Sequence, residues 1–132
     1  HFSEIVLQDF NVFINPETIR LWLLNENIVE WARIEFKEGW NPETTLKTIS
    51  AFANDIDNLG GGYIIIGVEE KDGSPVFPIK GIEQSRIDGI LKELVGYCRC
   101  IEPLYNPIAE PVLYQDAYVI VIWVSGGYGR PW

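Results

Sequence analysis

The sequence has one histidine and two cysteines, and each scarcity excludes a class of site. His1 is the first residue, which disfavours serine-type and His-dependent cysteine catalysis because neither has a well-placed general base. Cys98 and Cys100 stand too close together for an easy disulfide. They also lack the second cysteine pair or nearby histidine of a zinc site, so we expect reduced thiols.

Long apolar runs are absent as well. No segment approaches the roughly 20 apolar residues that cross a bilayer, and no basic region precedes an apolar stretch as in a signal peptide. We therefore expect a cytoplasmic protein without a membrane partner. Because there is no Met at position 1 and the sequence stops at SGGYGRPW, we expect residues 1–132 to be a single domain from the N-terminal part of a longer chain.

Basic residues are few, since ten Lys and Arg stand against nineteen Asp and Glu, giving a formal charge of -9. A field of this sign repels phosphate backbones, so any contact with nucleic acid must be local. The acid excess fits divalent-cation binding or plain solubility, and solubility is the commoner explanation. With 47% apolar and 22% charged residues, the chain has the composition of one folded domain with a buried core.

The tetrapeptide NPET occurs at residues 15–18 and 41–44 and has the pattern of a helix start. Asn caps free amides, Pro fits the first helical position, and Glu complements the helix dipole. The apolar spacing that follows each copy predicts one helix over about 16–27 and another over about 42–56. A third helix is predicted over about 85–96, with Ser85 at its N-cap.

Five segments have strand patterns. One, with alternating polar and apolar residues, is typical of a half-buried strand, and another is apolar on both faces, as in the middle of a sheet. Asp72-Gly73 and Gln115-Asp116 are turn signals that each predict a returning strand. The predicted strands cover residues 33–37, 63–68, 76–80, 112–115 and 117–124. This order predicts a single α/β (α+β) domain with a mixed β-sheet flanked by about three helices.

The glycines at 60–62 invite a nucleotide-binding interpretation that their position contradicts. The dinucleotide fingerprint follows a strand and opens a helix, whereas these glycines follow a predicted helix and open a strand. The sequence also has no Gly-Lys-Ser/Thr for a phosphate-binding loop. We interpret the glycines as a tight connection into the central strand.

The stretch EWARIEFK places two acids and a lysine close together. If its half-buried strand lies beside the central strand, Glu35 could approach Glu69 or Glu70, with Glu30 added from a preceding bend. Such oxygen ligands hold Mg²⁺ or Mn²⁺, and a metal with a nearby lysine such as Lys37 can cut a phosphodiester. Solvated surface acids are the alternative, because nineteen acids produce such groupings by chance.

Taken in order, these motifs resemble the Schlafen AlbA-like domain family. The family pattern is Glu, four residues and Glu-Phe-Lys, then Ser-Ala-Phe-Ala-Asn, two glycines, an apolar strand, Gly-Val and acids. The matching positions are Glu30, 35–37, 50–54, 61–62, 64–68 and 69–70, followed by Gly81-Ile82, Ile101-Glu102-Pro103 and Arg130-Pro131-Trp132. The resemblance covers about residue 17 to the end.

The resemblance implies an α/β domain that binds nucleic acid, DNA more often than RNA, in bacterial transcriptional regulators or helicase-related proteins. Binding would need no cofactor. The candidate contacts to the nucleic-acid backbone are Arg33, Lys37, Lys47 and Arg130.

The resemblance also implies an alternative, because some animal members use acids at these positions as metal ligands of an RNA-cutting site. Carried over, Glu30, Glu35 and Glu69 or Glu70 would be catalytic, with Glu30, Glu35 and Glu70 as ligands of Mg²⁺ or Mn²⁺. Trp31 departs from the small polar residue usual after the first Glu. A third hypothesis is a non-catalytic protein-interaction module, including self-association into a homo-oligomer.

Overall fold

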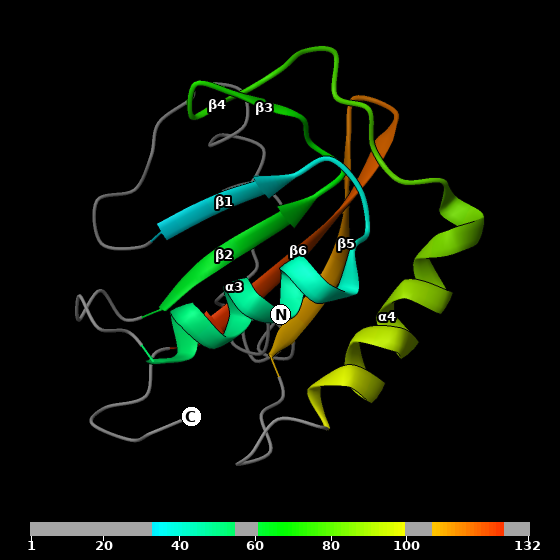
Figure 1. The fold of residues 1–132 in the computed structure, drawn as a ribbon. Helices are drawn as coiled ribbons and strands as arrows, with labels where there is room; N and C mark the ends of the chain where they lie inside the picture. Colours follow the sequence, from blue (N-terminus) through cyan, green and yellow to red (C-terminus); the bar gives the residue numbers. More distant parts are fainter. Residues whose placement is uncertain (1–32, 55–60, 100–106, 126–132) are drawn as a thin grey trace, which may run out of the picture.

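The computed structural model describes residues 33–54, 61–99 and 107–125 of the chain (Figure 1). Its elements are β1 (Arg33–Lys37), α3 (Pro42–Asn54), β2 (Gly61–Ile66), β3 (Glu70–Lys71), β4 (Ser74–Pro75), α4 (Gln84–Cys98), β5 (Ile108–Tyr114) and β6 (Ala117–Ser125). Within these ranges there are two helices and a mixed sheet, which confirms the predicted α+β class. The helix predicted over 16–27 lies outside the described residues.

Four strands form the main sheet in the order β1-β2-β6-β5 (Figure 1). β1 runs parallel to β2, with Arg33 opposite Gly62 and Lys37 opposite Ile66, and α3 forms the crossover between the two strands. β2 and β6 are antiparallel, as are β6 and β5. The prediction that the half-buried strand lies beside the central strand is therefore confirmed.

The two central strands bury side chains on both faces. Ile64 and Ile66 of β2 belong to a core that includes residues of α3 and α4, which we call the helix-side core. Tyr63 and Ile65 point to the other face, where they join a second core with β5 and β6. A strand covered on both faces has no polar side, which explains the uninterrupted apolar sequence of β2 and β6.

The hairpin between β5 and β6 turns at Gln115 and Asp116, as predicted. Their φ angles are 46° and 67°, and two successive positive φ angles define the type I′ turn that joins antiparallel strands. β5 begins at Ile108, four residues before the predicted strand.

The third predicted helix is confirmed as α4, but its predicted N-cap is wrong and it extends two residues beyond Gly96. Glu83 occupies the N-cap position without a side-chain cap, so Ser85 lies inside α4 rather than capping it. The helix continues past Gly96 to Cys98, because Cys98 is fully buried and extends the apolar stripe one turn beyond Leu94. Burial of that stripe outweighs the low helix propensity of glycine.

The strand predicted over residues 76–80 is not formed. β3 and β4 pair across the predicted turn at Asp72-Gly73, and β4 ends at Pro75. Val76 N donates to the Glu69 carbonyl at 2.8 Å, the next position in the same register. Pro75 and Pro78 have no amide hydrogen to donate to a neighbouring strand. Ile79 still contributes to the second core, so beyond Val76 the segment is held by burial rather than by strand pairing.

Two glycines join the ends of β1 and β2 to the segment before α4. Gly67 N donates to the Lys37 carbonyl at 2.7 Å, and Gly81 N donates to the Gly67 carbonyl at 2.7 Å. Both glycines have positive φ, 109° and 74°, which other residues adopt only with strain. These bonds fix the end of β1, where Lys37 stands.

Cys98 is a buried free cysteine, and burial raises the pKa of its thiol. The free thiol of Cys98 agrees with the reduced state expected from the sequence, and a buried neutral thiol is unreactive. Cys100 lies outside the described residues.

Neither α3 nor α4 has the length and apolar character required to span a bilayer.

Candidate nucleic-acid interface

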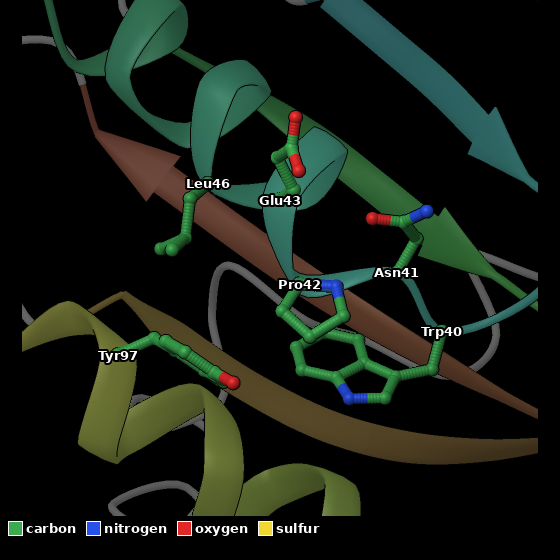
Figure 2. A pocket seen from close by; sticks show the side chains of 6 residues that line it. All are labelled: Trp40, Asn41, Pro42, Glu43, Leu46 and Tyr97. Atoms are coloured by element: carbon green, nitrogen blue, oxygen red, sulfur yellow. The ribbon is translucent and has the colours of Figure 1, made fainter.

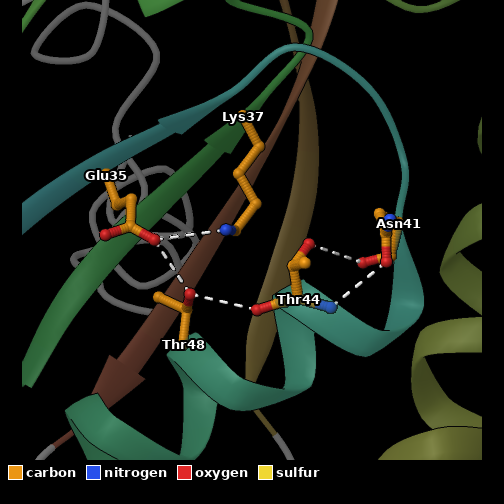
Figure 3. Close-up of polar contacts among 5 residues, drawn as sticks. All are labelled: Glu35, Lys37, Asn41, Thr44 and Thr48. Atoms are coloured by element: carbon orange, nitrogen blue, oxygen red, sulfur yellow. Dashed lines mark hydrogen bonds and ion pairs between the residues drawn. The ribbon is translucent and has the colours of Figure 1, made fainter.

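Glu35 and Lys37 of β1 face α3 and meet Thr48 of that helix (Figure 3). Lys37 Nζ lies 3.2 Å from Glu35 Oε2, and the Thr48 hydroxyl donates to the same carboxylate oxygen at 2.8 Å. A spacing of two residues puts both β1 side chains on one face of the strand, as the sequence predicted. We call Glu35, Lys37 and Thr48 the strand–helix cluster.

The two charges of this cluster differ in exposure. The Lys37 side chain is 16% exposed, whereas that of Glu35 is 43% exposed. Lys37 is thus largely covered between β1 and α3, and its ammonium group is held by Glu35. A covered and paired lysine is better suited to fixing the geometry of the cluster than to reaching far into solvent.

Asn41 caps α3 beside this cluster (Figure 3). Thr44 N donates to the Asn41 side-chain oxygen at 3.2 Å, and Thr45 N donates to the Asn41 carbonyl at 3.0 Å. The second NPET is therefore a helix start, as predicted, with Pro42 as the first helical residue. The first NPET lies outside the described residues.

Lys47 is the exposed cation next to the strand–helix cluster. It precedes Thr48 on α3, and its side chain is 76% exposed. Its ion-pair partner is Glu43, one helical turn earlier, at 3.8 Å. An exposed pair of this kind contributes roughly 0.3–0.5 kcal/mol, so Lys47 can exchange Glu43 for another anion at small cost.

The acids after β2 form a different group. Lys80 Nζ lies 2.5 Å from a Glu38 oxygen and 3.3 Å from a Glu69 oxygen, and these carboxylates, Glu38 first, raise the pKa of Lys80. Glu70 is exposed at the start of β3. The structure thus joins Glu69 to Lys80 and Glu38, while Glu35 is joined to Lys37 and Thr48.

Over residues 33–54, 61–99 and 107–125, no three side chains of His, Cys, Asp or Glu are grouped so that they could hold a metal ion. Glu30 lies outside these ranges, so the proposed ligand set of Glu30, Glu35 and Glu70 stays a prediction. Arg33 opens β1, but its side chain lies outside the described part, and so does Arg130.

Sequence reasoning missed Thr48, Glu38 and Lys80. Thr48 has a faint signal in its position one turn after Thr44 on the polar side of α3. The contact between Lys80 and Glu38 joins residues 42 apart in sequence, so no local sequence pattern predicts it.

Known proteins resemble this chain in sequence and in fold. The family model described as Schlafen, AlbA_2 matches residues 30–131. No curated protein matches the chain. The fold is similar to the solution structure of the N-terminal domain of a RecG-related candidate ATP-dependent DNA helicase from Nitrosomonas europaea. That match has a TM-score of 0.59 and 21% identity, and covers 80% of this chain and 69% of the other.

A second similar structure is the DIP2311 protein from Corynebacterium diphtheriae, with a TM-score of 0.50 and 20% identity. The alignment covers 87% of this chain and 23% of that protein, so the chain spans about a quarter of its length. At these identities the two structures show a shared fold. Because the family model covers most of the sequence and its motifs form β1, α3 and β2, the chain belongs to the Schlafen AlbA_2 family.

Proposed function

We propose that this domain binds nucleic acid, DNA in preference to RNA, through the phosphate backbone, as part of a bacterial transcriptional regulator or helicase-related protein. Family membership supports the proposal, as does the fold shared with a domain of a RecG-related candidate DNA helicase. Binding of this kind requires no cofactor.

The observation that carries the proposal is an exposed, weakly paired lysine adjacent to the hydrogen-bonded strand–helix cluster. Lys47 is 76% exposed and 3.8 Å from its only described ion-pair partner, Glu43. A phosphate oxygen can replace that carboxylate while the helix remains in place, because Thr48 is hydrogen-bonded to Glu35 of β1. Phosphate contacts of this kind position a protein on its nucleic acid without reading bases.

The other predicted contacts take different parts in this proposal. Lys37 fixes Glu35 and the adjoining turn of α3, with its ammonium group reaching the surface only in part. Arg33 stands at the start of β1, two residues before Glu35 on the same strand, and we assign it and Arg130 to backbone contacts as well. The net charge of -9 limits binding to such a local surface.

Lys47→Ala should weaken binding of a fluorescein-labelled DNA duplex roughly two- to fivefold, the effect of one exposed ion pair. Lys92→Ala is the matched control, because Lys92 is 78% exposed and also pairs with an acid one turn earlier, Asp88 at 3.1 Å. Fluorescence anisotropy measures both. An equal loss in the two variants would mean that only overall charge matters, and no loss in Lys47→Ala would remove the assigned contact.

A further inference from the structure

A pocket of about 550 Å³ lies between the N-terminal end of α3 and the C-terminal part of α4 (Figure 2). Its lining residues are Trp40, Asn41, Pro42, Glu43, Leu46 and Tyr97. This volume is in the range of sites that take small ligands or single side chains. None of the lining residues belongs to the strand–helix cluster.

Two aromatic side chains from different elements form part of the pocket. Trp40 precedes α3, and the Tyr97 side chain extends from α4 towards Trp40 (Figure 2). Trp40 Nε1 donates to a Glu93 carboxylate oxygen at 3.2 Å, which ties the indole to α4 and orients its ring. Tyr97 is 42% exposed, so much of its ring is open to a ligand. The faces of such rings attract cations.

The charge around the pocket is negative. Glu43 is the charged residue among the described lining residues, and the Glu93 carboxylate lies against the Trp40 indole. Glu43 is 81% exposed and only loosely paired with Lys47. Its side chain can therefore turn to a cation in the pocket at small cost. The net charge of -9 adds a field that attracts cations and repels anions.

The adjoining end of α3 offers few free donors to an anion. Pro42 has no amide hydrogen, and the amides of Thr44 and Thr45 both donate to Asn41. Glu43 adds a negative charge in the first turn. An anionic ligand is therefore disfavoured in spite of the positive end of the helix dipole.

We propose that this pocket binds the guanidinium group of an arginine side chain in a basic segment of a partner protein. A guanidinium is planar, stacks on aromatic faces such as those of Trp40 and Tyr97, and presents paired donors to a carboxylate such as Glu43. Pro42 and Leu46 supply apolar contacts for the methylene stem of the arginine. Lysine fits less well because its ammonium group is more strongly hydrated.

The test uses a short peptide of glycine, serine and arginine, beside the same peptide with citrulline, a neutral isostere, at each arginine. NMR titration of the ¹⁵N-labelled chain should show the Trp40 indole N–H signal shifting with the arginine peptide and staying in place with the citrulline peptide. Trp40→Phe assigns that signal by its loss. Equal shifts with both peptides, or none with the arginine peptide, would overturn the proposal.

Single substitutions test whether the arginine peptide binds in this pocket. Tyr97→Ala and Glu43→Gln should each weaken binding of the arginine peptide roughly two- to fivefold. Phe77→Ala is the aromatic control, since Phe77 is 41% exposed, and Asp88→Asn is the acidic control, since Asp88 is 82% exposed and pairs with a lysine one turn on. The two controls should leave affinity unchanged. Parallel losses in variants and controls would contradict the assignment.

Lys47→Ala separates this proposal from nucleic-acid binding. Removing Lys47 frees Glu43, so the arginine peptide should bind up to about twofold more tightly while the DNA duplex binds more weakly. Either result can fail without the other. A single-stranded oligonucleotide that displaces the peptide and shifts the Trp40 signal itself would assign the pocket to a nucleobase and overturn the proposal.

Discussion

Gly81→Ala should lower the free energy of unfolding by about 2–5 kcal/mol, as the sum of backbone strain and overpacking. Gly81 has φ 74°, and a Cβ placed there would stand 2.8 Å from Ala117 Cβ and 3.1 Å from the Tyr118 carbonyl oxygen. Ala117 follows a tight turn and Tyr118 accepts a bond from Ile82 N at 2.7 Å, so neither can move freely. Urea unfolding followed by circular dichroism measures the loss.

Gly73→Ala is the matched control for this effect. Gly73 also has positive φ, 84°, but a Cβ there would have no atom within 4 Å. Gly73→Ala should therefore lower the free energy of unfolding by about 1–2 kcal/mol, from the strain of the left-handed conformation alone. Equal losses for the two substitutions would mean that the close contact with β6 plays no part in stability.

Ile64→Ala should lower the free energy of unfolding by about 2–5 kcal/mol, because the substitution leaves a cavity in the helix-side core. Ile64 is fully buried, and it stands opposite Glu35 of β1 and Ile122 of β6 in the sheet. The loss should also loosen the packing between β2 and α3 on which the strand–helix cluster depends. Chemical unfolding gives the stability change, and NMR of Thr48 reports the effect on the cluster.

Leu113→Ala provides the comparison for a surface position on the same sheet. Leu113 lies on β5 and is 42% exposed, so its truncation should change stability by about 0.5 kcal/mol or less. A loss in Ile64→Ala as small as in Leu113→Ala would contradict the central position of β2.

The sequence predicted the parts of this fold that depend on local patterns. An apolar run without a polar face specified a doubly covered strand, and β2 lies between β1 and β6. Alternation in 33–37 put Glu35 and Lys37 on one face, where they form an ion pair at 3.2 Å. Asp116 and its neighbour Gln115 specified the turn between the last two strands.

The parts that failed depend on contacts between distant segments. The end of α4 is set by burial of Cys98 in the helix-side core. No capping residue or glycine in that helix predicts where it ends. The bond from Trp40 to Glu93 joins residues 53 apart and exists only because α3 and α4 pack together. Which turn of α3 faces β1 also depends on that packing, so Thr48 could not be assigned to the site beforehand.

The salt dependence of DNA affinity tests the proposed nucleic-acid binding most directly. For the 132-residue chain and a labelled duplex, the logarithm of the association constant should fall linearly with the logarithm of salt concentration, with a slope near -0.9 for each phosphate contact. Lys47→Ala should make that slope shallower by about 0.9, while Lys92→Ala leaves it unchanged. Undetectable binding at low salt, or one slope for all three proteins, would contradict the proposed interface.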